Sequence, residues 1–441
     1  MAFQERRSLI RRLEEIRNSK VLCFLTSIRP NVPSVISEDC VRAMYDHLLL
    51  LPSRPIEKLD LFLCSNGGVG TVSWRIVALL REFATKVNVL IPYRAYSAAT
   101  MIALGADEIV MHPFGELGPI DPTVSNDFNP VEGNRRLGIS VEDVTAYVGF
   151  IKNTVGITHE DELIKAVEVL ANKVHPLALG NVERFLSQSR MIARKILRTH
   201  MNEDQEHIIN EIVENMASKL YFHGHAINRR EAIIDLHLKV TVDLSPELET
   251  TMWNLYRDFE NEFRNLEIFH PAGDIAAMVT PAQVPTMPSS ALPQPQPIPQ
   301  SAPPAESPAN SPEKAPNEQS SSPEITQSGM PFPPHLMQMM QQAQPQSPKQ
   351  KQYELLHVVI ESDGLSSQFT TTRRFTEMMA PGPMPQRIIQ EDVIGQGWTH
   401  QIPPQPSSSP SPRTAQSPAD AQQGANPLQD KSGRKVRRRK A

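Results

Sequence analysis

Two strand-like segments, each ending in a turn of small residues, constrain this chain more than any other feature. The first, residues 59–68, ends in two glycines, and the second, residues 87–92, leads into a small-residue turn around Ser97. Between them, residues 71–83 place apolar side chains mostly on one face of a predicted helix. The order strand, glycine turn, helix, strand, serine turn, helix predicts a pair of parallel βα units.

The two turns carry the residue types that acyl transfer needs. In parallel sheets, ligands and chemistry lie at the carboxyl ends of the strands, which is where both turns fall. Glycines let a backbone approach a substrate closely, and free N–H groups surround a serine at a helix N-terminus. A nucleophile beside amides that can hold an oxyanion indicates an acyl-transfer site. The plainer alternative is that Ser97 only caps a helix, since serine is a preferred N-cap residue.

The residues around these turns resemble a known family. Leu61–Gly68, Pro92–Thr100 and Leu104–Pro122 are similar to the serine dehydrogenase proteinase family, a relative of signal peptide peptidase A in the ClpP/crotonase superfamily. The resemblance covers roughly Ser8–Val242, about half of the chain. It implies an α/β fold, a ClpP/crotonase-like spiral of β-β-α units with a helical C-terminal region, followed here by a long disordered tail.

The resemblance also implies an activity, that of a serine endopeptidase acting on a peptide or protein substrate. Ser97 is then the nucleophile, and the backbone N–H groups of Gly68 and Ala98 form the oxyanion hole. Signal peptide peptidases have glycine where this chain has Ala98, a mild departure because the contact comes from the backbone. A side chain at Gly68 is expected to obstruct the substrate groove. No cofactor and no metal are implied.

The general base is the least constrained assignment. Serine needs a partner that takes its proton, and signal peptide peptidases use a neutral lysine that follows an element similar to Leu137–Ser140. The next lysine is Lys152, which is therefore the predicted base, although most helix lysines are simply exposed. The other candidates are Lys165, Lys173, Lys195 and, as a histidine base, His112.

The residues do not favour a nucleotide-binding or a metal-binding site. Gly67, Gly68 and Gly70 lack the full spacing of a dinucleotide-binding loop. His223 and His225 have no third ligand spaced to complete a metal site. Two alternatives stay open: a catalytically weak or inactive peptide-binding scaffold whose tail recruits partners, and an acyl-CoA enzyme that shares the fold without needing the serine.

The distribution of prolines predicts a folded N-terminal part and a largely unfolded C-terminal part. Eleven of the 40 prolines lie at or before Pro246. We expect a peptidase domain at residues 1–270, a disordered Pro/Ser/Gln-rich linker at 271–352, a strand-containing segment at 353–400 and a disordered tail at 401–441.

Two segments in the C-terminal half of the chain are candidate contact sites for other parts of the chain or for partner molecules. Tyr353–Ile360 has a good strand pattern, and predicts either a strand docked on the folded domain or a neighbouring subunit, or a free segment. Arg434–Lys440 is a basic cluster, either a solvated tail or a weak contact for nucleic acid or an acidic surface.

Cysteine usage and the N-terminus suggest the compartment. The three cysteines are scattered and odd in number, the first residues are polar, and no apolar run reaches the ~18 residues of a membrane span. We therefore expect a cytoplasmic protein. The resemblance implies a homo-oligomer, and the amphipathic helices of residues 177–220 are its predicted interface.

Overall fold

The computed structural model describes residues 3–120, 123–124, 127–132, 135–219, 225–278, 348–380 and 386–403. Most of the predicted linker (271–352) and of the predicted tail (401–441), including the basic cluster, lies outside the described residues. No helix within these ranges is long and apolar enough to cross a membrane.

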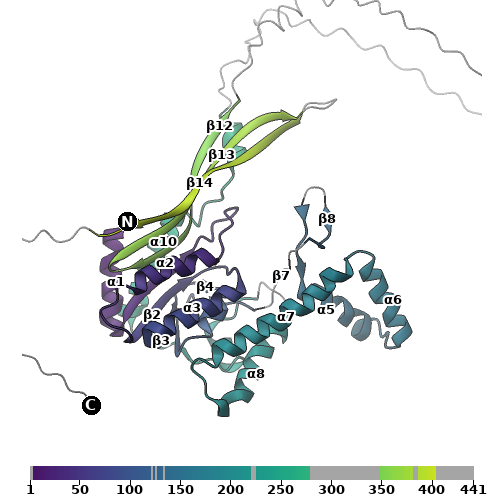
Figure 1. Cartoon of the computed structure of the whole chain (residues 1–441), viewed down its shortest axis with the longest axis horizontal. Helices are drawn as coiled ribbons and strands as arrows, with labels where there is room; N and C mark the ends of the chain where they lie inside the picture. Colours follow the sequence, from purple (N-terminus) through teal and green to yellow (C-terminus); the bar gives the residue numbers. More distant parts are fainter. Residues whose placement is uncertain are drawn as a thin grey trace, which may run out of the picture. The chain divides into compact units, whose positions relative to one another are not determined.

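Eight strands of the described residues form one sheet, ordered β11-β5-β3-β2-β1-β12-β13-β14 (Figure 1). Their bounds are β1 Lys20–Thr26, β2 Ile56–Cys64, β3 Ala84–Ile91, β5 Glu108–Met111, β11 Val240–Thr241, β12 Gln350–Ser362, β13 Leu365–Ala380 and β14 Gln386–Gln401. The strands from β11 to β1 pair in parallel, whereas β12, β13 and β14 add to β1 in antiparallel fashion.

A short second strand follows each of the central parallel strands. After β2, Ser65 bridges in parallel to Ala95 of β4 (Arg94–Ala95), and β4 pairs in parallel with β6 (Glu116–Leu117). Helices α3 (Gly70–Phe83) and α4 (Ala98–Ala103) come next in the first two units. This repeated strand, short strand, helix order is the predicted β-β-α arrangement, and the mixed α/β class is confirmed.

Helices cover both faces of the sheet because strand side chains alternate between them. Leu22 and Phe24 face α2, α3, α4, α7 and α8, whereas Val21, Cys23 and Leu25 face α1 and α10. The remaining helices are α1 Phe3–Arg17, α2 Glu38–Leu48, α5 Val141–Gly149, η1 Phe150–Thr154, α6 Glu160–Ala171, α7 Pro176–Leu197, η2 Glu203–Gln205, α8 Glu206–Glu214, η3 Asn215–Lys219, α9 Arg229–Ile234, α10 Pro246–Phe263 and α11 Pro271–Ala277.

Helices α7 and α8 hold the residues predicted as an oligomer interface. Their apolar faces are buried within the chain itself: Ile192 and Ile196 of α7 and Ile209 and Ile212 of α8 belong to the main core. These faces are therefore already covered, and an interface with another copy would need a different surface.

The C-terminal strands belong to the same compact unit as the N-terminal half. Val358–Glu361 of β12 pair with Cys23–Thr26 of β1, so Tyr353–Ile360 is docked on the folded domain, and one unit extends to Ile402. The domain thus does not end near residue 270. The physical reason is that β1 would otherwise leave an unpaired edge beside a buried core.

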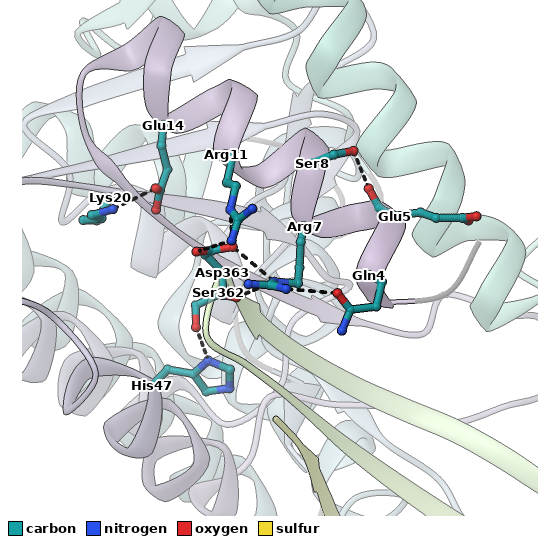
Figure 2. A network of polar contacts seen from close by, with 10 residues as sticks. All are labelled: Gln4, Glu5, Arg7, Ser8, Arg11, Glu14, Lys20, His47, Ser362 and Asp363. Atoms are coloured by element: carbon teal, nitrogen blue, oxygen red, sulfur yellow. Dashed lines mark hydrogen bonds and ion pairs between the residues drawn. The ribbon is translucent and has the colours of Figure 1, made fainter. Parts of the chain in front are cut away.

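Helix α1 holds the turn between β12 and β13 in place. Arg7 Nε donates to the backbone oxygen of Asp363 at 2.7 Å, and Arg11 Nε lies 2.7 Å from Asp363 Oδ1 (Figure 2). The first helix of the chain therefore contacts residues that lie about 350 positions further along the sequence.

Candidate active site

Ser97 occupies a strained turn between β4 and α4. Its backbone has φ 51° and ψ −112°, a region that residues other than glycine rarely adopt and that costs on the order of 1–3 kcal/mol. Although it stands at the N-cap position, its side chain caps nothing. The half-buried hydroxyl has no hydrogen-bond partner within the described part of the chain. Helix capping therefore does not explain why serine stands here.

Gly67 brings a second backbone turn directly against Ser97. Its φ is 104°, and a Cβ built on it would lie 2.7 Å from the backbone oxygen of Tyr96 and 2.9 Å from Ser97 Cβ. No side chain fits in that space, and the positive φ further favours glycine. The glycine turn is thus required for two backbone turns to meet at the serine.

Gly68 is held from one side by the segment before α2. The Ile36 N–H donates to Gly67 O at 2.8 Å, and the Val69 N–H donates to Ile36 O at 2.9 Å. In a parallel bridge of this kind, the N–H of the intervening residue, Gly68, points to the opposite side. A Cβ on Gly68 would overlap the backbone of Ile36. The expectation that a side chain here obstructs the groove is therefore wrong: it would displace Ile36 instead.

Ser97 and Gly68 line the same cavity, with a volume of about 530 Å³. Its other lining residues are Asn66, Val69, Gly70, Thr71, Met101, Ile120, Phe185, Gln188, Ser189 and Ile192. Helices α3 and α4 both begin at this cavity, and neither has a side-chain N-cap. Because the first N–H groups of a helix have no intrahelical acceptor, the backbone amides here favour a developing negative charge.

Buried hydroxyls fix the two turns. Ser73 Oγ donates to Ala98 O at 2.7 Å, and the Gly67 N–H donates to Ser65 Oγ at 3.0 Å. Thr100 Oγ1 donates to Ala95 O at 2.6 Å and accepts from the Gly118 N–H at 3.2 Å. Sequence reasoning did not assign these residues, and their only signal was a hydroxyl side chain among apolar neighbours, in α3 and α4 for Ser73 and Thr100 and directly after β2 for Ser65.

The structure does not bring the predicted base to the serine. Lys152 lies exposed on η1 and is not among the cavity-lining residues. Lys165 and Lys173 are also exposed, and Lys195 lies over the Trp74 ring. None of the described residues that line the cavity has an amine, imidazole or carboxylate side chain.

The histidines considered from the sequence have structural contacts. His112 stacks on Trp253, and its Nδ1 accepts from the Phe114 N–H at 3.1 Å. Burial lowers the pKa of His112, and the residue does not line the cavity. His225 Nε2 lies 2.6 Å from Glu231 Oε1, while His223 is outside the described residues. Across the ranges that the structure describes, no three His, Cys, Asp or Glu residues could hold a metal ion.

Comparison with protein families finds a match in the N-terminal part of the chain. Residues 1–132 match the family of ClpP-like SDH-type serine proteinases, and this segment contains the glycine turn, Ser97 and the block up to Pro122. The family resemblance predicted from the motifs is confirmed. Over these residues the chain is similar to ClpP-like SDH-type serine proteinases.

Two individual relatives match shorter parts of the chain. Two uncharacterized proteins of Methanocaldococcus jannaschii, MJ1495 and MJ0137, are 36% and 30% identical over 89 and 121 residues, or 20% and 26% of this chain. The chain spans 30% and 42% of their lengths, less than half of each.

Two solved structures are also similar. One is a mutant of the 1510-N membrane-bound stomatin-specific protease, with 14% identity and a TM-score of 0.29 over 53% of this chain and 84% of that chain. The other is the ClpP protease catalytic domain from Plasmodium falciparum, with 9% identity and a TM-score of 0.27 over 53% of this chain and 90% of that chain.

Proposed function

We propose that this chain is a serine endopeptidase in which Ser97 Oγ attacks a peptide carbonyl carbon. The amine portion leaves, and water then hydrolyses the acyl-serine ester. The observation that carries the proposal is the strained Ser97 turn, whose hydroxyl serves no described structural contact and opens on a cavity beside Gly68. Strain is retained at such positions when it orients a reacting group.

The oxyanion of the tetrahedral intermediate is proposed to lie between the N–H groups of Gly68 and Ala98. The Gly68 N–H points away from Ile36, and Ala98 is the first residue of α4, so its N–H has no intrahelical acceptor. Ser73 Oγ donates to the Ala98 carbonyl oxygen at 2.7 Å and so holds this peptide in place. Removing one such donor typically costs about 10²–10³ in kcat.

A lysine is proposed to take the Ser97 proton, and Lys152 remains the predicted one. Because Lys152 is exposed on η1, this role requires η1 to approach the cavity when a substrate binds. The position of Lys152 outside the cavity lining also favours a second candidate function. Without a base at the serine, the cavity would bind a peptide without cleaving it, as a scaffold does.

A fluorophosphonate probe separates these functions, since it reacts only with an activated serine. The peptidase predicts that the probe labels the full chain at Ser97 and that Ser97→Ala abolishes both labelling and peptide hydrolysis. Ser53→Ala, at an exposed serine outside the cavity, should change neither. A folded chain that binds peptides without labelling or hydrolysis would support the scaffold, and hydrolysis that survives Ser97→Ala would refute the proposed mechanism.

A further inference from the structure

Strand β14 presents a long open edge. It is the last strand of the sheet, and no described strand pairs with its outer side. It runs for 16 residues without a proline, and Ile388, Val393 and Ile394 are exposed on it. Free backbone N–H and C=O groups along such an edge pair readily with another strand.

The edge extends well beyond the part of the sheet that pairs with β1. Only Val358–Glu361 of β12 pair with β1, whereas the β12–β13 and β13–β14 ladders continue to Gln350, Ala380 and Gln386 (Figure 1). The far part of β14 is therefore one side of a three-stranded ribbon. The ribbon packs on the segment around α11 through Leu355 and Phe375, while no described strand covers the outer backbone edge of β14.

The remaining segments of this chain are poorly suited to cover the edge. Residues 279–347 and 404–427 carry prolines at short intervals, and proline cannot donate a ladder hydrogen bond. The proline-free end, 428–441, is strongly basic, and its only β-branched residue is Val436. A strand from another molecule fits the edge better.

The sequence of β14 points to a second copy of this chain. Around Glu391 the residues read Ile-Ile-Gln-Glu-Asp-Val-Ile, a pattern that is palindromic in its apolar and polar positions. A twofold antiparallel pair centred on Glu391 places Ile389 opposite Val393 and Gln390 opposite Asp392 of the other copy. An interface on a twofold axis must be self-complementary in this way.

We propose that β14 pairs with β14 of a second copy, centred on Glu391, to form a continuous sheet across a homodimer. The negative charge of each central Glu391 carboxylate is compensated within its own copy, because Glu391 Oε1 accepts from Arg373 Nη1 of the neighbouring strand at 2.6 Å. The assembly surface is then the C-terminal ribbon, in place of helices α7 and α8.

The register makes a sharp crosslinking test possible on the full chain. In an antiparallel pair, residues opposite each other have Cα atoms about 4.5–5.5 Å apart, within the range of a disulfide. Glu391→Cys should therefore form a disulfide-linked dimer under mild oxidation. The matched control Gln401→Cys lies on the same strand, but its two copies would be ~68 Å apart at ~3.4 Å per residue, so it should stay monomeric on a non-reducing gel. The native cysteines Cys23, Cys40 and Cys64 are buried.

A second variant tests whether the disulfide depends on strand pairing or forms by chance encounters between two chains. Adding Val393→Lys to Glu391→Cys places a charge on the paired edge, and the disulfide yield should fall several-fold. Dimer formation by Glu391→Cys alone, lost on adding the lysine and absent in Gln401→Cys, supports the pairing. No crosslink at position 391, equal crosslinking at 391 and 401, or a yield that the lysine leaves unchanged overturns it.

Discussion

The Arg6 guanidinium and the Glu361 carboxylate join the first helix to strand β12 through two parallel hydrogen bonds. Arg6 Nε donates to Oε2 at 2.8 Å, and Arg6 Nη2 donates to Oε1 at 2.6 Å. Both side chains are almost fully buried. Burial by itself would lower the pKa of Arg6, but the hydrogen bonds and charge of Glu361 raise it, so the arginine stays charged. Asp258 of α10 accepts a third hydrogen bond at 2.8 Å.

This pair predicts that the C-terminal strands depend on α1 for stability. Arg6→Ala should lower the free energy of unfolding by about 3–5 kcal/mol, because it leaves buried carboxylates without their partner. Arg11→Ala is the matched control: its ion pair with Asp363 is largely exposed and should contribute no more than about 1 kcal/mol. Urea unfolding measures both, and equal losses in the two variants would contradict the prediction.

His47 makes the docking of the same strands sensitive to acid. Its Nδ1 lies 2.9 Å from Ser362 Oγ and its Nε2 lies 3.0 Å from Ser367 Oγ, which also contacts His400. Burial, followed by the charge of His400, lowers the pKa of His47 to about 3. Since the folded pKa lies below the ordinary ~6.5 of histidine, the unfolded state binds the proton more tightly.

Protonation of His47 is therefore expected to destabilise the folded state as the pH falls. The contribution of His47 to stability is complete above about pH 6.5 and is lost as the pH falls towards about 3. Hydrogen exchange of the Val358–Ile360 amides should therefore quicken between pH 6 and 4 after correction for intrinsic rates. His47→Gln, which has no charge to gain, should flatten that dependence, and an equally steep dependence in the variant would assign it to other groups.

Thr100 is expected to position the serine turn through its hydroxyl. Thr100→Val keeps the side-chain shape but removes the hydroxyl's hydrogen bonds to the Ala95 and Gly118 oxygens, at a cost of about 0.5–1.5 kcal/mol, while the Gly118 N–H still donates to Ala95 O. The rate of fluorophosphonate labelling should fall as the turn loosens. Thr100→Ser retains the hydroxyl and should label at nearly the parent rate. Slow labelling by both variants would show that the methyl group, rather than the hydrogen bonds, matters.

The proposed lysine base predicts a loss of activity at a position outside the described cavity lining. Lys152→Ala should remove hydrolysis about as completely as Ser97→Ala, since members of a catalytic unit are not additive. Lys152→Arg should not restore it, because arginine does not give up its proton. Lys165→Ala, on the neighbouring α6, is the control. Full activity of Lys152→Ala in a peptide-hydrolysis assay would exclude this base.

Local sequence patterns anticipated the elements around the site. The strand at 59–68, the helix at 71–83 and the strand at 87–92 correspond to β2, α3 and β3, with shifts of a few residues at their ends. Local patterns sufficed here because each element shows its own apolar periodicity, and because the glycines and Ser97 fall where consecutive elements must turn.

What the sequence determined by itself was therefore the order of the βα units and the meeting of a glycine turn with a serine turn. Only the tertiary structure decided that β12 closes the edge of β1, that Gly68 faces Ile36 and that Lys152 is exposed. A strand pattern in one segment does not reveal which strand more than 300 residues away it pairs with. Likewise, the direction in which a glycine or a lysine faces depends on what the rest of the chain packs against it.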